Sequence, residues 1–314
     1  MPRSRPDRQD AWITALVRYR SAAVTPQPSK RRSTRPSPRP FLKWAGGKRA
    51  LLPQILGALP EGKFEFYVEP FLGGGAVFLE SFRTGRIGRA VLCDRNLELV
   101  ETWRAVKTAP KTVFELFGQW AQDKESYYAV RALEPAELSP HARAARVIYL
   151  NRNGFNGLYR LNRSGGFNVP YGAYTRPQRL DLDNLLAVSH ALKSVELVCE
   201  DFESVLKAAP AGAVTYCDPP YWPASKTASF RDYDQRGFTG EDQQRLGACF
   251  RELGGRGIVG LLSNADVPET RALYAGLEIG TVQCRRSINR DGAKRGMVNE
   301  LLVRTPTVDG LKTP

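Results

Sequence analysis

Four consecutive residues, Asp218-Pro219-Pro220-Tyr221, combine the side chains best suited to chemistry in this sequence. They follow an apolar run at 213–217 that is typical of a buried strand, and open α/β sheets bind ligands at the carboxyl ends of their strands. The prolines stiffen the turn and fix the directions of its carbonyl groups. The Asp218 carboxylate and the Pro219 carbonyl can each accept one hydrogen of an aromatic amino group, while Tyr221 stacks on the ring. We therefore predict that these four residues catalyse transfer to an amine, mainly by positioning and electrostatics. The plain alternative is a strand that ends in a proline turn.

A glycine-rich loop, EPFLGGG at 69–75, precedes an expected helix that begins at Ala76. Glycines between a strand and a helix let a ligand approach the backbone and the positive end of the helix. Asp94 ends the next expected strand, 21 residues after Gly73, where an acid can reach ribose hydroxyls. Phe78 stands where the dinucleotide pattern has its third glycine, which disfavours NAD and favours another adenosine cofactor. The candidate cofactor-binding residues here are Glu69, Phe71, Gly73, Gly75 and Asp94.

The segment FLKWAGGK at 41–48 combines an aromatic ring, two glycines and a lysine. This combination suits a cofactor that carries a flat ring and a carboxylate. We expect Trp44 to pack beside the cofactor and Lys48 to pair with its carboxylate. A core tryptophan and a surface lysine are the general alternative.

A polar stretch at 151–176 is rich in asparagine, glycine and arginine. Asparagine and arginine are the side chains that read base edges with paired hydrogen bonds. Phe155, Leu158 and Tyr159 could stack or wedge where a base leaves a duplex. An irregular polar loop would explain the same composition.

Strand and helix patterns alternate on both sides of a mainly helical stretch at 104–194. The alternation predicts a parallel α/β sheet interrupted by a helical insertion. The expected strands are 66–71, 90–94, 195–200, 213–218, 257–263, 277–284 and 299–304. The expected helices begin at residues 76 and 97 and span 202–208, 241–253 and 268–275. The acidic pair Asp181 and Asp183 is best explained as helix capping.

Composition narrows the classes of function. The 314 residues are 42% hydrophobic and 25% charged, which is typical of a globular protein, and no apolar run suits a membrane helix. Five cysteines without metal spacing and only two histidines argue against a metal site, a zinc deaminase or a histidine-dependent hydrolase. The net charge of +14 points to a polyanion partner, but residues 1–40 hold ten basic residues against two acidic ones. The remainder is only mildly basic.

Seven segments in order resemble the Dam-type (D12 class) DNA adenine-N6 methyltransferases. They are FLKWAGGK at 41–48, EPFLGGG at 69–75, LCDRN at 92–96, YLNRNGFNGLYR at 149–160, FNVPYG at 167–172, YCDPPY at 216–221 and LLSN at 261–264. The resemblance covers about residues 40 to 304. It implies a Rossmann-like methyltransferase sheet with a helical target-recognition insertion, S-adenosyl-L-methionine as cofactor, and double-stranded DNA as partner.

The resemblance also implies roles for single residues. Trp44, Lys48, Asp94 and Asp218 match positions that contact S-adenosylmethionine, and Asp201 follows the third expected strand, where related enzymes place an acid near the cofactor's adenine. Asp218, Pro219 and Tyr221 match positions that hold the flipped adenine. The segment 222–237 matches a mobile loop of the family. Tyr159 departs from the smaller residue of the best-known members. The candidate DNA-binding residues are Arg152, Phe155, Asn156, Leu158, Arg160 and Pro170.

From these features we expect a DNA adenine methyltransferase with GATC as its first candidate site, acting as a monomer or weak dimer on DNA, without a metal or a membrane, in bacterial cytoplasm or encoded by a phage. The alternatives are methylation of an amino group on RNA adenine or cytosine, and a non-catalytic DNA-binding relative. We expect four regions: a disordered basic extension at 1–38, a catalytic domain at 39–103 and 195–306, a target-recognition domain at 104–194, and a tail at 307–314.

Overall fold

The computed structural model describes residues 37–44, 46–162, 164–222, 237–285 and 297–306. The chain divides into two units at residue 35, and the fold described here belongs to the second unit, Pro36–Pro314. Most of the expected basic extension, the expected tail and most of the loop that follows the Asp218 motif lie outside the described residues.

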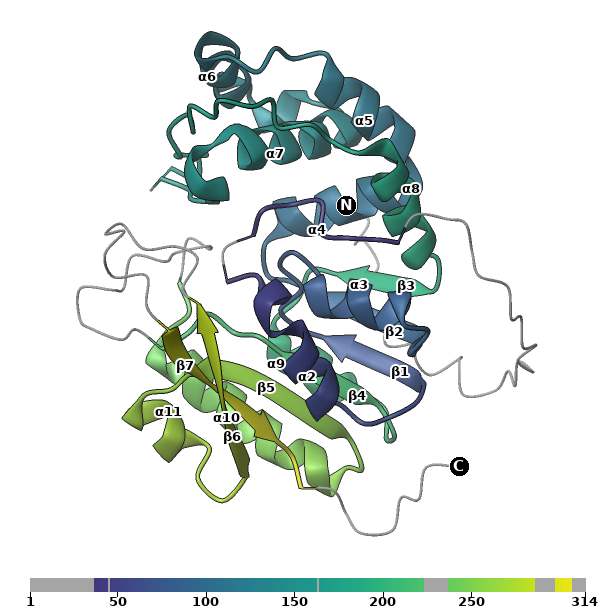
Figure 1. Ribbon diagram of the computed structural model, residues 1–314, viewed down its shortest axis with the longest axis vertical. Helices are drawn as coiled ribbons and strands as arrows, with labels where there is room; N and C mark the ends of the chain where they lie inside the picture. Colours follow the sequence, from purple (N-terminus) through teal and green to yellow (C-terminus); the bar gives the residue numbers. More distant parts are fainter. Residues whose placement is uncertain (1–36, 45, 163, 223–236, 286–296, 307–314) are drawn as a thin grey trace, which may run out of the picture. The chain divides into compact units, whose positions relative to one another are not determined.

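A seven-stranded sheet with the order β3-β2-β1-β4-β5-β7-β6 forms the centre of the second unit (Figure 1). Its strands are β1 Phe64–Glu69, β2 Ile87–Cys93, β3 Val195–Val198, β4 Val214–Cys217, β5 Val259–Ala265, β6 Glu278–Arg285 and β7 Met297–Arg304. The α/β fold class is thus confirmed, and the expected strand ends differ from the observed ones by at most three residues.

The expectation of a wholly parallel sheet is wrong at one edge. Strands β1 to β5 are parallel to one another, but β7 runs antiparallel to both β5 and β6. Eleven residues, 286–296, separate β6 from β7. A parallel crossover needs about a dozen residues or more, so these two strands can pair only as antiparallel neighbours.

The helices of the described residues fall into two groups. Helices α2 and α3 lie on one face of the sheet, and α9 and α10 lie on the other, while α4 to α8 form the helical insertion (Figure 1). Their bounds are α2 Leu52–Ala58, α3 Ala76–Arg83, α4 Leu97–Thr108, α5 Pro110–Gly118, α6 Lys124–Ala132, α7 Pro140–Asn153, α8 Leu182–Ala191, α9 Phe202–Ala208, α10 Gly240–Gly255 and α11 Pro268–Leu273. Short 3-10 helices span η2 Lys48–Leu51, η3 Pro135–Glu137 and η4 Phe155–Gly157. The expected domain boundary at 103/104 falls inside α4.

Side-chain caps fix where several of these helices begin. Asn96 caps α4 by accepting a hydrogen bond from Leu99 N, and Asp181 caps α8 by accepting one from Asn184 N, as expected. Thr239 and Asp242 form a reciprocal capping box at the start of α10. Because a capping side chain satisfies backbone N–H groups that the first helical turn leaves free, each cap specifies its helix from the local sequence.

Asn151 joins the first described segment, residues 37–44, to residues 155–160, which follow α7. This fully buried side chain accepts from Lys43 N (2.8 Å) and donates to the carbonyls of Lys43 (2.8 Å) and Gly157 (3.0 Å). Gly157 has a φ of +63°, and a Cβ there would lie 2.4 Å from Lys43 Cβ. The FLKWAGGK segment is thereby held beside residues 155–160, although more than 100 residues separate the two.

Candidate active site

The carboxyl ends of four neighbouring parallel strands carry most of the candidate site. Asp201 follows β3, Asp94 follows β2, the loop with Gly73 follows β1, and Asp218 follows β4. The chain order reverses between β1 and β4, and open α/β sheets bind ligands at such a switch point. The topology therefore gathers residues that lie far apart in the sequence along one edge of the sheet.

Asp218 is held by a lysine and a serine. Lys48 Nζ lies 2.7 Å from Asp218 Oδ1, and the Ser263 hydroxyl donates to the same oxygen at 3.0 Å. Lys48 is only 6% exposed, and its Nζ also donates to Gly46 O at 2.7 Å. Burial raises the pKa of Asp218, whereas the Lys48 charge and the two hydrogen bonds oppose that rise. Lys48 thus pairs with Asp218 in this structure, and its pairing with a cofactor carboxylate stays a prediction.

Tyr221 is held from two sides. Its hydroxyl donates to Glu300 Oε2 on β7, and Lys48 Nζ lies 4.7 Å from the centre of its ring. Burial, followed by the nearby carboxylates of Asp218 and Glu300, raises the pKa of Tyr221, so the phenol stays protonated. These contacts orient the ring beside Asp218, where a planar base can stack on it.

The proline turn is fixed from α10. Gln243 Nε2 donates to Pro220 O at 2.8 Å, and Asn264 Nδ2 donates to Gln243 Oε1 at 3.1 Å. Gln243, Asn264 and Pro219 are all buried. The stiffness expected of two prolines is therefore reinforced by hydrogen bonds from distant elements.

Glu69, an expected cofactor contact, lies in the interior. It is 2% exposed and accepts a hydrogen bond from the Tyr67 hydroxyl at 2.8 Å. Burial raises the pKa of Glu69 to about 8, with the Tyr67 hydrogen bond opposing and the Asp218 charge adding to the rise. Because the carboxyl group is enclosed by protein, we assign it to the support of the site and withdraw it as a direct cofactor contact.

The glycine loop is built around two tryptophan side chains. Gly73 and Gly75 have φ of +47° and +64°, and Cβ atoms there would lie 2.8 Å from Trp44 and 2.7 Å from Trp103. Trp103 Nε1 also donates to Gly73 O at 3.1 Å. The glycines are needed for these close approaches as well as for the turn, a reason that the sequence alone did not reveal.

Asp94 organises the same loop through its carboxylate. Its Oδ2 accepts from Gly73 N and its Oδ1 from Asn96 N, each at 3.0 Å. Phe71 lies at the same edge of the sheet, with its ring 5.5 Å from Phe202 and 5.7 Å from Phe238. This edge of the sheet thus offers the fixed carboxylate of Asp94, which suits a ribose. It also offers the rings around Phe71, which suit the base of an adenosine.

Trp44 faces Tyr159, which belongs to the segment that follows α7. Its ring lies 5.3 Å from that of Tyr159, and the Tyr159 hydroxyl donates to Glu98 at 2.5 Å. Tyr159 is 4% exposed, so the expectation that it stacks or wedges at a flipped base is wrong. A side chain enclosed between Trp44 and α4 cannot enter a duplex without unfolding this contact.

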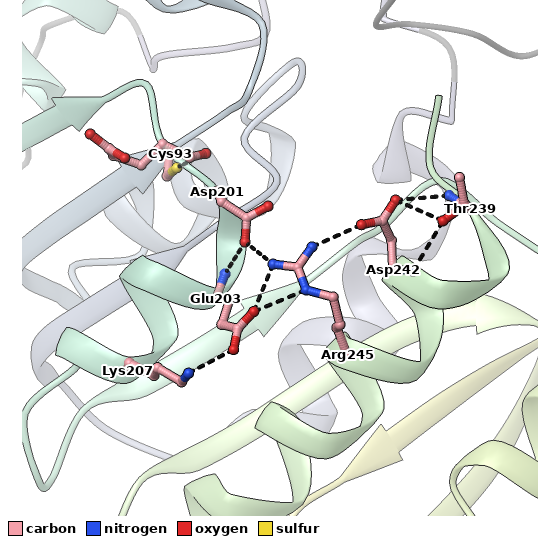
Figure 2. A network of polar contacts seen from close by, with 8 residues as sticks. Cys93, Asp201, Glu203, Lys207, Thr239, Asp242 and Arg245 are labelled. Carbon is pink, nitrogen blue, oxygen red and sulfur yellow. Dashed lines mark hydrogen bonds and ion pairs between the residues drawn. The ribbon is translucent and has the colours of Figure 1, made fainter. Parts of the chain in front are cut away.

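Asp201 is part of a charged network between α9 and α10 (Figure 2). Its Oδ1 accepts from Glu203 N at 3.0 Å and from Arg245 at 2.7 Å. Arg245 also contacts Glu203 at 2.6 Å and Asp242 at 2.9 Å, and Lys207 contacts Glu203 at 2.6 Å. The expected cofactor acid is therefore oriented by a cation from another helix.

The expected DNA-binding residues differ in their exposure. Phe155 is 47% exposed, Asn156, Arg160 and Pro170 are exposed, and Leu158 is half-buried. Arg160 donates twice to Asn168 O, which braces the turn that it belongs to. All five lie on the segment that follows α7, and four of them are exposed.

Arg152 is the exception among these residues. Its guanidinium donates to Phe41 O at 2.9 Å and to Arg179 O at 2.5 Å. Burial lowers its pKa. These carbonyls occupy the donors that base reading would require, so we correct its role to that of a brace between the first described segment and the residues before α8.

Several residues that shape the site were not assigned from the sequence. Ser263 and Asn264 stood within the LLSN segment, but their contacts depend on β5 lying beside β4. Arg245, Gln243 and Glu300 had no local signal, because their contacts to Asp201, Pro220 and Tyr221 span at least 23 positions. The part of the chain that the structure describes contains no group of three or more potential metal ligands and no helix able to cross a membrane.

The fold is an α/β sheet whose strand ends bring together the glycine loop, Asp94, Asp201 and the turn that begins at Asp218. The model of the D12 class N6 adenine-specific DNA methyltransferases matches residues 44–288, so the chain belongs to that family. It is 39% identical over 273 residues to the Type II methyltransferase M1.LlaDCHI of Lactococcus lactis subsp. cremoris, spanning 84% of this chain and 94% of that protein.

Other relatives agree with this assignment. The chain is 38% identical over 283 residues to the Type II methyltransferase M.MjaIII of Methanocaldococcus jannaschii, covering 84% of this chain and 98% of that protein. It is 38% identical over 268 residues to the DNA adenine methylase of Escherichia coli strain K12, covering 84% and 94%. Among solved structures, a putative methyltransferase from Thermoplasma acidophilum aligns over 82% of this chain and 75% of its own at 10% identity, but the TM-score of 0.29 is too low to support a shared fold.

Proposed function

We propose that this chain transfers a methyl group from S-adenosyl-L-methionine to the exocyclic amino group of an adenine that is flipped out of duplex DNA, with GATC as the first candidate site. The observation that carries the proposal is the Asp218 carboxylate, held at the end of β4 by Lys48 and Ser263. Within the part of the chain that the structure describes, both contacts fall on Oδ1. We therefore assign Oδ2 as the oxygen that accepts from the substrate amino group.

The residues present fit the proposed cofactor. Phe71, Phe202 and Phe238 form an aromatic cluster next to Asp201, and Asp94 is fixed at the glycine loop. These groups suit a purine and a ribose, and Trp44 covers the same loop. S-adenosylmethionine carries its methyl group on a sulfonium sulfur and, when bound, supplies it as the electrophile.

The protein's own contribution is to make the amino nitrogen a nucleophile. The lone pair of that nitrogen is delocalised into the purine, so the amino group reacts poorly when it is planar. Hydrogen bonds to Asp218 Oδ2 and to the Pro219 carbonyl pull its two hydrogens out of the ring plane, and Tyr221 holds the base in place by stacking. The nitrogen gains the methyl group and loses one proton, and the carboxylate of Asp218 is the acceptor nearest to that hydrogen.

Phe155 and the exposed residues after it provide the proposed DNA contacts. An exposed phenylalanine at 47% is suited to fill the gap that a flipped base leaves. Arg160 and Asn156 offer donors to base edges, while Leu158 and Pro170 offer apolar contacts.

Methyl transfer from tritiated S-adenosylmethionine to unmethylated DNA, with and without GATC, tests this proposal. We expect N6-methyladenine in the digested product, and incorporation only when GATC is present. Incorporation only into DNA that lacks GATC would overturn GATC as the recognition site. Label found in RNA or on cytosine would favour the alternative substrates. If the protein binds DNA but transfers no label to any substrate, a DNA-binding relative without catalysis is favoured. Asp218→Ala serves as the control, with turnover lost and the fold retained.

A further inference from the structure

Arg245 stands at the meeting point of α10 with the edge of the sheet. Its guanidinium contacts the carboxylates of Asp201 (2.7 Å), Glu203 (2.6 Å) and Asp242 (2.9 Å), each from a different direction (Figure 2). The same group lies over the Phe202 ring, with Cζ 4.9 Å from the ring centre. One cation therefore fixes an acid of the candidate cofactor edge and one face of an aromatic ring that packs beside it.

The aromatic cluster next to this cation has a solvent-accessible side. Phe202 itself is 1% exposed, but Phe71 and Phe238 are only partly buried, and their rings lie 5.5 Å and 5.8 Å from that of Phe202. Asp201 is also partly exposed, at 32% of its side chain. A flat ligand that reaches these two phenylalanines would meet the Asp201 carboxylate at its edge.

The network fixes the orientation of the Asp201 carboxylate. Its Oδ1 accepts from Glu203 N and from Arg245, and a charge-assisted bond to a guanidinium fixes a carboxylate more firmly than a bond to a neutral donor. The same cation lowers the pKa of Glu203, after the larger effect of Lys207, and it contributes to lowering that of Asp242. The charged forms of Glu203 and Asp242 are thereby favoured, although these two acids lie beside Asp201.

We propose that Arg245 is a positioning residue that holds Asp201 to accept a hydrogen bond from the 6-amino group of the cofactor's purine, and so sets a preference for adenine over hypoxanthine at this edge. The inference rests on the proposed use of an adenosine cofactor. A 6-amino group can donate to the carboxylate, whereas the 6-oxo group of hypoxanthine would face it with another acceptor. Arg245 itself acts only through Asp201 and Phe202.

A purely structural role for the network leads to a different expectation. Arg245 is 36% exposed, and exposed ion pairs contribute little to stability. Loss of such a pair would lower stability slightly and would weaken every ligand alike, or none. A changed preference between two purines is therefore a readout that a structural role does not move.

The test compares S-adenosylhomocysteine with S-inosylhomocysteine, its 6-oxo counterpart, by calorimetric titration of the full chain without DNA. We expect the wild-type protein to bind the adenine compound more tightly. In Arg245→Gln the affinity for the adenine compound should fall roughly tenfold, which is the size of one charge-assisted hydrogen bond, while that for the 6-oxo compound changes little. KM for DNA should stay the same in methylation assays.

Lys207→Gln is the matched control, because it removes another cation of the same network. Lys207 pairs with Glu203 rather than with Asp201, and its side chain is 62% exposed. The purine preference of Lys207→Gln should therefore stay at the wild-type value. Arg245→Lys keeps the charge but loses the fork of donors, and it should give an intermediate preference; it also keeps the test decisive if Arg245→Gln does not fold.

The possible failures can be told apart. An unchanged ratio of the two affinities in both Arg245 variants, with wild-type binding intact, overturns this inference and leaves the proposed function standing. An equal fall for both compounds also overturns it, since that result indicates a structural role. Wild-type protein that binds neither compound overturns the proposed cofactor, and the inference with it.

Discussion

Lys48 and Asp218 form an ion pair inside the candidate active site, with Lys48 Nζ 2.7 Å from Asp218 Oδ1. The lysine begins η2 and the aspartate follows β4, so the two paired groups lie 170 positions apart in the sequence. Since burial alone raises the pKa of Asp218, the lysine charge is what favours the carboxylate that the proposed chemistry needs. Asp218 thus depends on a segment that the sequence pattern associates with the cofactor.

Lys48→Met should therefore impair both catalysis and stability. Without the cation the pKa of Asp218 rises further, so the acidic limb of kcat/KM should move to higher pH, because the active carboxylate is lost at a higher pH. Breaking a buried pair should also cost about 3 kcal/mol of unfolding free energy. Lys48→Arg keeps the charge and should shift the pH profile less. A pH profile that is identical in Lys48→Met and the wild type would contradict the role assigned to the pair.

Tyr221 should show separable effects of its ring and its hydroxyl. Tyr221→Ala removes stacking, which is worth about 1–3 kcal/mol per base, so kcat/KM should fall roughly tenfold to a hundredfold. Tyr221→Phe removes only the hydrogen bond to Glu300 and should cost far less. Single-turnover methylation of a DNA duplex measures both.

Glu300→Gln provides the partner variant for the hydroxyl. If the hydrogen bond orients the ring, the double variant with Tyr221→Phe should be no worse than the more impaired single variant. Strictly additive losses would mean that Glu300 and the hydroxyl act independently.

The local signals of the sequence were enough to predict the core of the fold and one edge of the site. Asp94 and Asp218 stand directly after their strands, and Gly73 stands in the loop that follows β1. Parallel strands bring such positions together whatever lies between them in sequence. The antiparallel course of β7 was missed, because an apolar strand pattern does not encode its direction. The α/β class with a helical insertion followed from the alternation of elements and is confirmed.

Residues that depend on distant contacts could not be predicted in the same way. Arg152 stands in a polar stretch, yet it turns inward because carbonyls at 41 and 179 lie within its reach. Tyr159 is buried because Glu98 and Trp44 meet it from elements more than 60 residues away. Arg245 had no motif, since its function depends on α9 and α10 lying side by side. A pattern shows which residues can bind DNA or cofactor, but packing decides which are free to do so.

Tyr159 should support the cofactor edge through Trp44. Tyr159→Leu removes the ring that Trp44 packs on, and truncating a buried aromatic side chain costs about 3–5 kcal/mol at most. We expect weaker binding of S-adenosylhomocysteine and a lower Tm, with the preference among DNA sequences unchanged. Tyr159→Phe keeps the ring and loses only the bond to Glu98, so cofactor binding should stay near the wild-type value. A changed DNA preference in Tyr159→Leu would show that the side chain does reach the duplex.

Glu69 should make stability fall as pH rises. Its pKa of about 8 in the folded chain lies above the ordinary value of 4.5, so between these values the folded state holds a proton that the unfolded state has released. The contribution of Glu69 to the free energy of unfolding is then fully present below its ordinary pKa. It declines as pH rises toward 8, by about 1.4 kcal/mol per pH unit. Glu69→Gln removes the titration but keeps the shape of the side chain. Urea unfolding of both proteins at several pH values isolates the effect as the difference between their slopes. Parallel slopes from pH 5 to 8 would mean that Glu69 does not hold this proton, whereas a flatter slope in the variant supports a neutral carboxyl group behind Asp218 at neutral pH.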